Sequence, residues 1–179
     1  MHGLFHMSPV PRFGDFAGSK RPGLSVAACL LFVAWFIPLD GAAAQSDAPL
    51  AGTVTLESSR SFEELRTSLE EAVEATEFAV VTRASASAGA ASRGVTIPGN
   101  LVVGVYRNDY AVRMLEASVP AGIEAPLRFY VTENADGTAS LTYREPTAIF
   151  APYGVPELDA MAAELDPIWQ RIAEEATGE

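Results

Sequence analysis

An apolar run near the start of the chain constrains the fold most, because it separates a leader from the part that can form a domain. The run covers the 14 residues 24–37, follows the positive charges of Lys20 and Arg21, and is followed by an Ala-Ala-Ala cleavage site. This order is typical of a secretory signal peptide, and the run is shorter than the roughly 20 residues of a membrane-spanning helix. We therefore predict a signal peptide over residues 1–44, the alternative being an uncleaved membrane anchor.

Removal of this leader would take away every cysteine, histidine and lysine of the chain. Cys29, His2, His6 and Lys20 all lie within it. Residues 45–179 then contain no thiol nucleophile, no imidazole for a catalytic triad, no lysine for a Schiff base, and no Cys or His ligand for zinc or haem. We predict no cofactor and no metal, which leaves the chemistry to Asp, Glu, Tyr, Arg, Ser and Thr.

The remaining domain is strongly acidic. Residues 45–179 keep 9 of the 12 basic residues and 21 of the 23 acidic residues, which gives a net charge of −12. Such a surface repels phosphate backbones and anionic lipid headgroups. We predict that the cleaved protein binds neither nucleic acid nor membrane, and that it is periplasmic or secreted.

Hydrophobic periodicity predicts a mixed order of strands and helices after a short lead-in at residues 45–52. Ser61 and Glu64 fit a capping box at the start of the first helix. In the second helix, we expect Val112, Met114 and Leu115 to face inward. The predicted strands are 53–57, 78–83, 100–106, 127–133 and 138–144; the predicted helices are 61–77, 109–117 and 156–176, with a possible short helix in 85–94. The last two strands form a hairpin, so the fold class is α+β: a single sheet of about five strands with helices packed on it.

The order and spacing of several short segments resemble the bacterial family called domain of unknown function 302 (DUF302). The segments are 61–65 (SFEEL), 78–81 (FAVV), 101–106, 122–128 (GIEAPLR), the turn at 136–137, 143–146 (YREP) and 153–154. The resemblance places a DUF302-like domain over residues 53–176. It implies an α+β fold and pairing of copies into a homodimer, and it implies no reaction. At residues 107–110 the chain has Arg-Asn-Asp-Tyr where the family tends to have a Gly-Asn-Pro-like turn.

Two carboxylates are the candidates for catalysis. Asp109 and Glu145 each follow a predicted strand, and a pair of carboxyl groups performs acid–base chemistry when burial separates their pKa values. The alternative is structural: Asp109 caps a helix and Glu145 lies in a solvated turn.

A group of arginine and tyrosine side chains is the candidate for ligand binding. Arg107, Arg128, Tyr130, Tyr143 and Arg144 lie on or beside predicted strands, and these residue types bind carboxylates and aromatic compounds. The alternative is that they form the solvent face of a hairpin with glutamate partners across the strands, such as Glu133.

Two classes of function follow. The first is an exported, non-catalytic module that self-associates and binds an unknown small molecule or a periplasmic protein. The second is a hydrolase or isomerase that uses carboxylates and tyrosine on an unknown substrate. The missing nucleophile and metal-ligand types favour the first.

Overall fold

A computed structural model describes residues 49–179, and the predicted signal peptide lies outside the described residues. The strands are β1 (Thr53–Ser58), β2 (Ala79–Ala84), β3 (Asn100–Tyr106), β4 (Leu127–Glu133) and β5 (Ala139–Arg144). The α-helices are α1 (Phe62–Glu74), α2 (Ala86–Ala91), α3 (Asn108–Ala117), α4 (Pro146–Phe150) and α5 (Pro156–Thr177), and the 3₁₀ helices are η1 (Val119–Glu124) and η2 (Ala151–Tyr153). The predicted α+β class and its five strands are confirmed. Three short helices, α4, η1 and η2, fall between the predicted elements.

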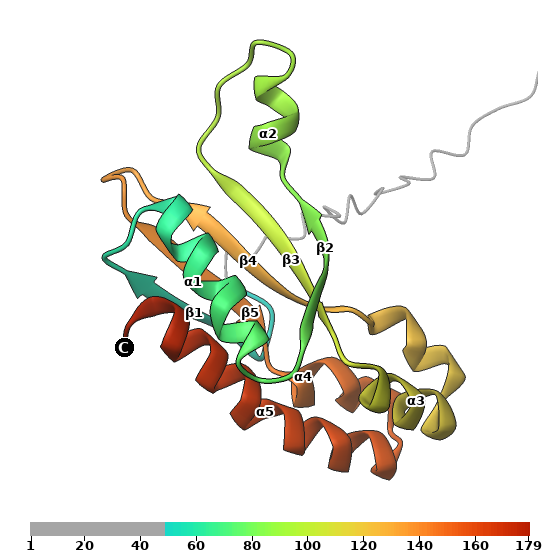
Figure 1. Ribbon diagram of the computed structural model, residues 1–179. Helices are drawn as coiled ribbons and strands as arrows, with labels where there is room; N and C mark the ends of the chain where they lie inside the picture. The colour runs from blue at the N-terminus through green and yellow to red at the C-terminus, as the bar shows by residue number, and fades with distance from the viewer. Residues whose placement is uncertain (1–48) are drawn as a thin grey trace, which may run out of the picture. The chain divides into compact units, whose positions relative to one another are not determined.

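The five strands form one antiparallel sheet in the order β1-β5-β4-β3-β2. Helices α1 and α5 lie side by side across one face of this sheet, and α2 projects beyond the ends of β2 and β3 (Figure 1). Alternation along the strands sends one set of side chains towards these helices and the other set to the opposite face, which no described helix covers. We call this opposite face the open face.

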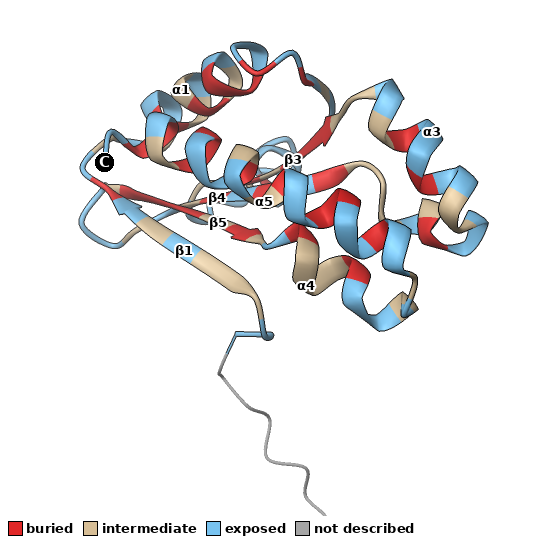
Figure 2. Cartoon of the chain, turned by 90° about the horizontal axis from the view of Figure 1, so that it is seen from below, coloured by how far each residue is buried: buried red, intermediate tan, exposed pale blue. Residues whose placement is uncertain are grey.

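The core fills the space between the sheet and the two long helices. Phe129 and Leu141 from the sheet, Leu69 from α1, and Trp169 and Ile172 from α5 are all 0–1% exposed. Both helices carry buried residues along one side and exposed residues along the other, as the colours of Figure 2 show. The apolar residues that recur about every 3.6 positions along α1 and α5 therefore pack against the sheet, as predicted.

The start of α1 has the predicted capping box. Ser61 Oγ accepts a hydrogen bond from the backbone N–H of Glu64, and Glu64 Oε2 accepts one from the backbone N–H of Ser61 at 2.9 Å. These two bonds satisfy donors that the first turn of a helix leaves free. The helix ends at Glu74, earlier than the predicted residue 77, and Glu77 has a positive φ of 64°.

Helix α3 corrects two predictions. Its N-cap is Arg107, so Asp109 lies in the first turn and is not the cap. Met114 is buried as expected, but Val112 and Leu115 are 46% and 45% exposed. The prediction that they face inward was wrong because α3 lies at the end of the sheet, where α5 and η1 contact only part of its circumference.

Candidate functional site

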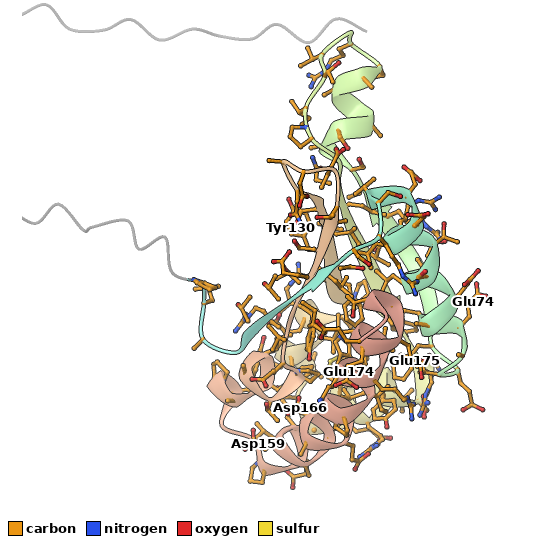
Figure 3. The ribbon with its side chains drawn as sticks, turned by 90° about the vertical axis from the view of Figure 1, so that its left-hand side faces the viewer. Glu74, Tyr130, Asp159, Asp166, Glu174 and Glu175 are labelled. Carbon is orange, nitrogen blue, oxygen red and sulfur yellow. The ribbon has the colours of Figure 1, made fainter. Side chains whose placement is uncertain are left out.

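The β4–β5 pairing decides which of the predicted binding residues share a face. Tyr130 lies opposite Thr142 on the open face and is 41% exposed, whereas Tyr143 lies opposite Phe129 and is 6% exposed on the helix side. Burial raises the pKa of the Tyr143 hydroxyl. Tyr130 is on the side of the sheet away from Glu74 of α1 (Figure 3). The two tyrosines are therefore separated by the sheet and do not form one site.

The hairpin arginines have different surroundings. Arg128 is exposed between the inward-facing Leu127 and Phe129, which places it on the open face. Arg144 is half-buried, and its Nη2 donates to the carbonyl oxygen of Ala148 in the middle of α4. Within residues 49–179 neither arginine forms an ion pair, and the expected partner Glu133 instead accepts from the backbone N–H of Gly99 at 2.6 Å.

The two candidate catalytic carboxylates do not form a buried pair. Asp109 accepts two hydrogen bonds from Arg107, from Nε at 2.7 Å and from Nη2 at 2.9 Å. The Arg107 guanidinium holds the pKa of Asp109 below its ordinary value. Glu145 is exposed at the N-cap of α4, and its side chain makes no capping hydrogen bond. Acid–base catalysis by a carboxyl pair needs one raised pKa, whereas the environment of Asp109 lowers its pKa.

An apolar pocket lies where the end of β3 meets α3, α4 and α5. Its cavity volume is about 40 Å³, far below the roughly 300–1,000 Å³ of small-molecule pockets, so in this conformation it has room for a few water molecules at most. Its lining residues include no carboxylate, and all except Arg107 are apolar or aromatic: Phe78, Val105, Tyr106, Arg107, Tyr110, Ala111, Met114, Ala125, Leu127, Phe150, Met161, Leu165 and Trp169. Arg107 is the one member of the predicted binding group that lines it.

Aromatic rings and the Arg107 guanidinium pack together along one side of the pocket. The Arg107 guanidinium carbon lies 4.8 Å from the ring centre of Phe78 and 4.5 Å from that of Tyr110. Trp169 makes an edge contact with Phe78 at 5.2 Å and stacks on Phe129 at 5.8 Å. These ring and cation–π contacts add packing energy on this side of the pocket.

Trp169 has one unusual property for a core residue. The side chain is 1% exposed, and its Nε1–H has no acceptor among residues 49–179. Buried N–H donors are nearly always paired. Phe78, Met161 and Trp169 are at most 5% exposed and belong to the core, and sequence reasoning missed that all three also line a pocket. The sequence feature that could have indicated this pocket is the position of Arg107 and Tyr110 within four residues of the end of a buried strand.

The described residues were expected to hold no metal, and their metal-ligand groups and helix lengths are as follows. Within residues 49–179, no group of three His, Cys, Asp or Glu side chains is placed to hold a metal ion. In the same part of the chain, no helix has the length and apolar character needed to cross a membrane.

The fold and the pocket define an α+β domain with one antiparallel sheet and a small aromatic site at its end. The chain belongs to the DUF302 family (domain of unknown function DUF302), whose model matches residues 54–176. It is similar to the crystal structure of an uncharacterized conserved DUF302 protein from Bacillus stearothermophilus, with 20% sequence identity and a TM-score of 0.64. That similarity covers 70% of this chain and 98% of the other, and it shows the fold alone. None of the curated proteins matches.

Proposed function

We propose that this DUF302 chain is an exported domain that binds a small organic ligand at the aromatic pocket, which widens to admit it, and that it performs no reaction on this ligand. The lining of that pocket carries the proposal. It combines a largely apolar, aromatic wall with a few polar groups, as ligand-binding pockets do. The lining contains no carboxylate and no hydroxyl nucleophile activated by a base. The two candidate catalytic carboxylates lie outside it: Asp109 is paired with Arg107, and Glu145 is exposed.

A pocket-filling substitution tests ligand binding. Ala111 lines the pocket and is 8% exposed, so Ala111→Leu should occupy ligand space. Ala163→Leu is the matched control, because Ala163 is exposed on α5. Each protein is purified from the periplasm of an expressing host and measured by native mass spectrometry. We expect bound mass on the wild type and on Ala163→Leu, and its loss from Ala111→Leu. Bound mass retained by Ala111→Leu would place the ligand elsewhere.

Export can be tested separately, by sequencing the N-terminus of the periplasmic protein. Lys20, Arg21, the apolar run 24–37 and the small residues before Gln45 support cleavage. N-terminal sequencing of the periplasmic protein should then begin at Gln45. A chain that keeps its leader and pellets with the membrane fraction would instead support the anchor.

We also propose that the exported domain pairs with a second copy. An exposed apolar patch on α3 and η1, the α3–η1 patch, supports this: Val112, Leu115, Val119 and Ile123 are 46%, 45%, 73% and 82% exposed. These side chains recur three or four residues apart, and α3 and η1 pack on each other. Large apolar side chains grouped on a surface commonly mark protein–protein contacts.

Serine substitutions test this pairing. Val119→Ser with Ile123→Ser removes most of the exposed apolar surface of the α3–η1 patch, whereas Val95→Ser removes a half-exposed valine from the loop after α2. Sedimentation velocity should show a dimer for the wild type and for Val95→Ser, and a monomer for the double variant. A dimer that survives the double substitution would exclude this patch as the interface, and a monomeric wild type would contradict the pairing itself.

A further inference from the structure

We infer that a cleft at the β1 edge of the sheet, the β1–α5 cleft, binds a small primary amine as its ammonium ion. The cleft is lined by residues of β1, β5, α5 and the N-cap of α4: Val54, Leu56, Tyr143, Glu145, Gln170 and Glu174. It shares no lining residue with the aromatic pocket, so the inference is independent of the proposed function. Figure 3 views the molecule from the β1 side, with Glu174 labelled on α5.

Strand pairing and the helix period bring these side chains together. Val54 lies opposite Tyr143 in the β1–β5 pairing, and both belong to the helix side of the sheet. Gln170 and Glu174 are four residues apart on α5, which packs against β1, so they project from one side of that helix. The cleft has a volume of about 300 Å³, at the lower end of the roughly 300–1,000 Å³ of small-molecule pockets. It is therefore large enough for a short alkyl amine.

Two carboxylates of the cleft have no cationic partner. Neither Glu145 nor Glu174 forms an ion pair within residues 49–179, and the lining contains no basic residue. Glu174 Oε1 accepts a hydrogen bond from Nε2 of Gln170 at 2.8 Å, and the side chain of Glu145 makes no capping hydrogen bond. An ammonium ion brings one positive charge and three N–H donors. Its hydrogen bonds to carboxylates are charge-assisted and therefore strong.

The hydroxyl of Tyr143 is the second observation that points to a ligand. Tyr143 is 6% exposed, and its ring packs on Phe129 at 5.5 Å. The hydroxyls of Tyr106 and Tyr153 bond to side chains, whereas that of Tyr143 has no hydrogen-bond partner within residues 49–179. Polar groups on residues buried to this degree are nearly always paired, so a ligand donor would complete its hydrogen bonding.

This hydroxyl opens into the β1–α5 cleft. Fully enclosed polar side-chain atoms without a partner are Arg144 Nε and Trp169 Nε1 within residues 49–179, so the Tyr143 oxygen keeps some accessible surface, and the cleft is the space that Tyr143 lines. Burial raises the pKa of the hydroxyl, and the nearby carboxylates of Glu145 and Glu174 raise it further. The phenol is therefore neutral at pH 7, and its oxygen can accept a hydrogen bond from an ammonium N–H.

The surroundings favour an organic ammonium ion over a metal ion. Asp166, the third carboxylate near Tyr143, already accepts hydrogen bonds from the backbone N–H and the hydroxyl of Thr147, at 3.0 and 2.8 Å. Val54 and Leu56 give the cleft an apolar wall, which an alkyl chain can cover but a hard cation cannot use. Residues 45–179 contain no lysine, so a second copy of the cleaved domain has no side-chain ammonium to offer.

Five probes separate the terms of this inference in NMR chemical-shift titrations of the protein purified from an expressing host. They are n-butylamine, which is cationic at pH 7, the neutral 1-butanol, the anionic butyrate, calcium chloride, and Nα-acetyllysine methylamide. The backbone amides of Val54, Leu56 and Glu174 report binding in the cleft. We expect n-butylammonium to shift these amides and to bind about tenfold more tightly than 1-butanol, the ratio that one charge-assisted hydrogen bond supplies. Butyrate should leave them in place.

Substitutions that keep the shape of the cleft identify the groups that bind. Glu145→Gln and Glu174→Gln each remove one charge and should each weaken n-butylammonium binding about three- to tenfold. Tyr143→Phe keeps the ring and should weaken it about threefold. Glu175→Gln is the matched control, because it removes the same charge from an exposed neighbour on α5 outside the cleft, and it should change the affinity less than about twofold. Unchanged amide shifts away from the cleft show that each variant is folded.

Four results would overturn the inference. Equal affinity for 1-butanol would mean that the charge is not recognised. Equal losses in Glu174→Gln and Glu175→Gln would reduce the binding to general attraction by an acidic surface. Tighter binding of calcium at the same amides would make this an inorganic cation site, and tighter binding of Nα-acetyllysine methylamide than of n-butylammonium would assign the cleft to a lysine side chain of another protein. The aromatic pocket is tested separately by Ala111→Leu, so the two proposals can fail independently.

Discussion

The packing of the helices can be tested by making the same substitution at two leucines that sequence periodicity treats as equivalent. Leu69 of α1 is 0% exposed, and Leu115 of α3 is 45% exposed. Leu69→Ala leaves a cavity between α1, the sheet and α5, and buried Leu→Ala substitutions cost about 2–5 kcal/mol. Leu115→Ala opens no enclosed space, because solvent already reaches the side chain, and it should cost less than about 1 kcal/mol.

Urea unfolding measures this difference. Trp169 is buried in the core, so its fluorescence follows the loss of tertiary structure. With a denaturant dependence of about 2 kcal/mol/M, a loss of about 3 kcal/mol at Leu69 lowers the midpoint by about 1.5 M. The corresponding shift for Leu115→Ala is below about 0.5 M. The measurement is made at low protein concentration, because dimer formation would add a concentration-dependent term.

Two results would refute this reasoning. Equal midpoint shifts for both variants would mean that α3 buries Leu115 as the sequence pattern suggested. A shift below about 0.5 M for Leu69→Ala would mean that α1 is not packed against the sheet. The α3–η1 patch predicts a second contrast: Leu115→Ala should weaken self-association, which Leu69→Ala affects only through unfolding.

Two further predictions concern the edge strand β2 and its neighbours. Hydrogen bonds from Arg83 of β2 hold the pKa of Glu70 of α1 below its ordinary value of 4.5, so the stability from this pair is complete above that pH and is lost as pH falls below it. Glu70→Gln should therefore lower the free energy of unfolding by less than about 1 kcal/mol at pH 7, and urea midpoints should converge with wild type in acid; a constant difference would contradict the pairing. Gly104→Ala should destabilise by about 1–3 kcal/mol, because the added methyl meets the Thr82 hydroxyl and lies 2.8 Å from Pro126 Cγ. Thr82→Ala in the same chain should restore part of that loss, and no restoration would show that Thr82 is not the obstruction.

The sequence by itself determined features that depend on residues close together in the chain. The capping box needs only Ser61 and Glu64, and it forms as predicted. The β4–β5 hairpin needs only the turn around Gly137, which has a φ of 86°. The apolar stripe of α5 likewise identified its buried face, because every member of the stripe repeats on the same helix. Interactions between residues close together in the chain are enough to indicate these elements from the sequence.

Tertiary structure alone decided which surfaces meet. Tyr130 and Tyr143 are both strand tyrosines, and only the β4–β5 register sends them to opposite faces. Val112 and Leu115 fit an inward pattern, but no described element covers that side of α3. The pocket is also a tertiary feature, because Phe78, Arg107 and Trp169 lie far apart in the sequence and meet only when α3 and α5 pack around the end of β3. A helix pattern shows which residues can be buried; the neighbouring elements decide which of them are.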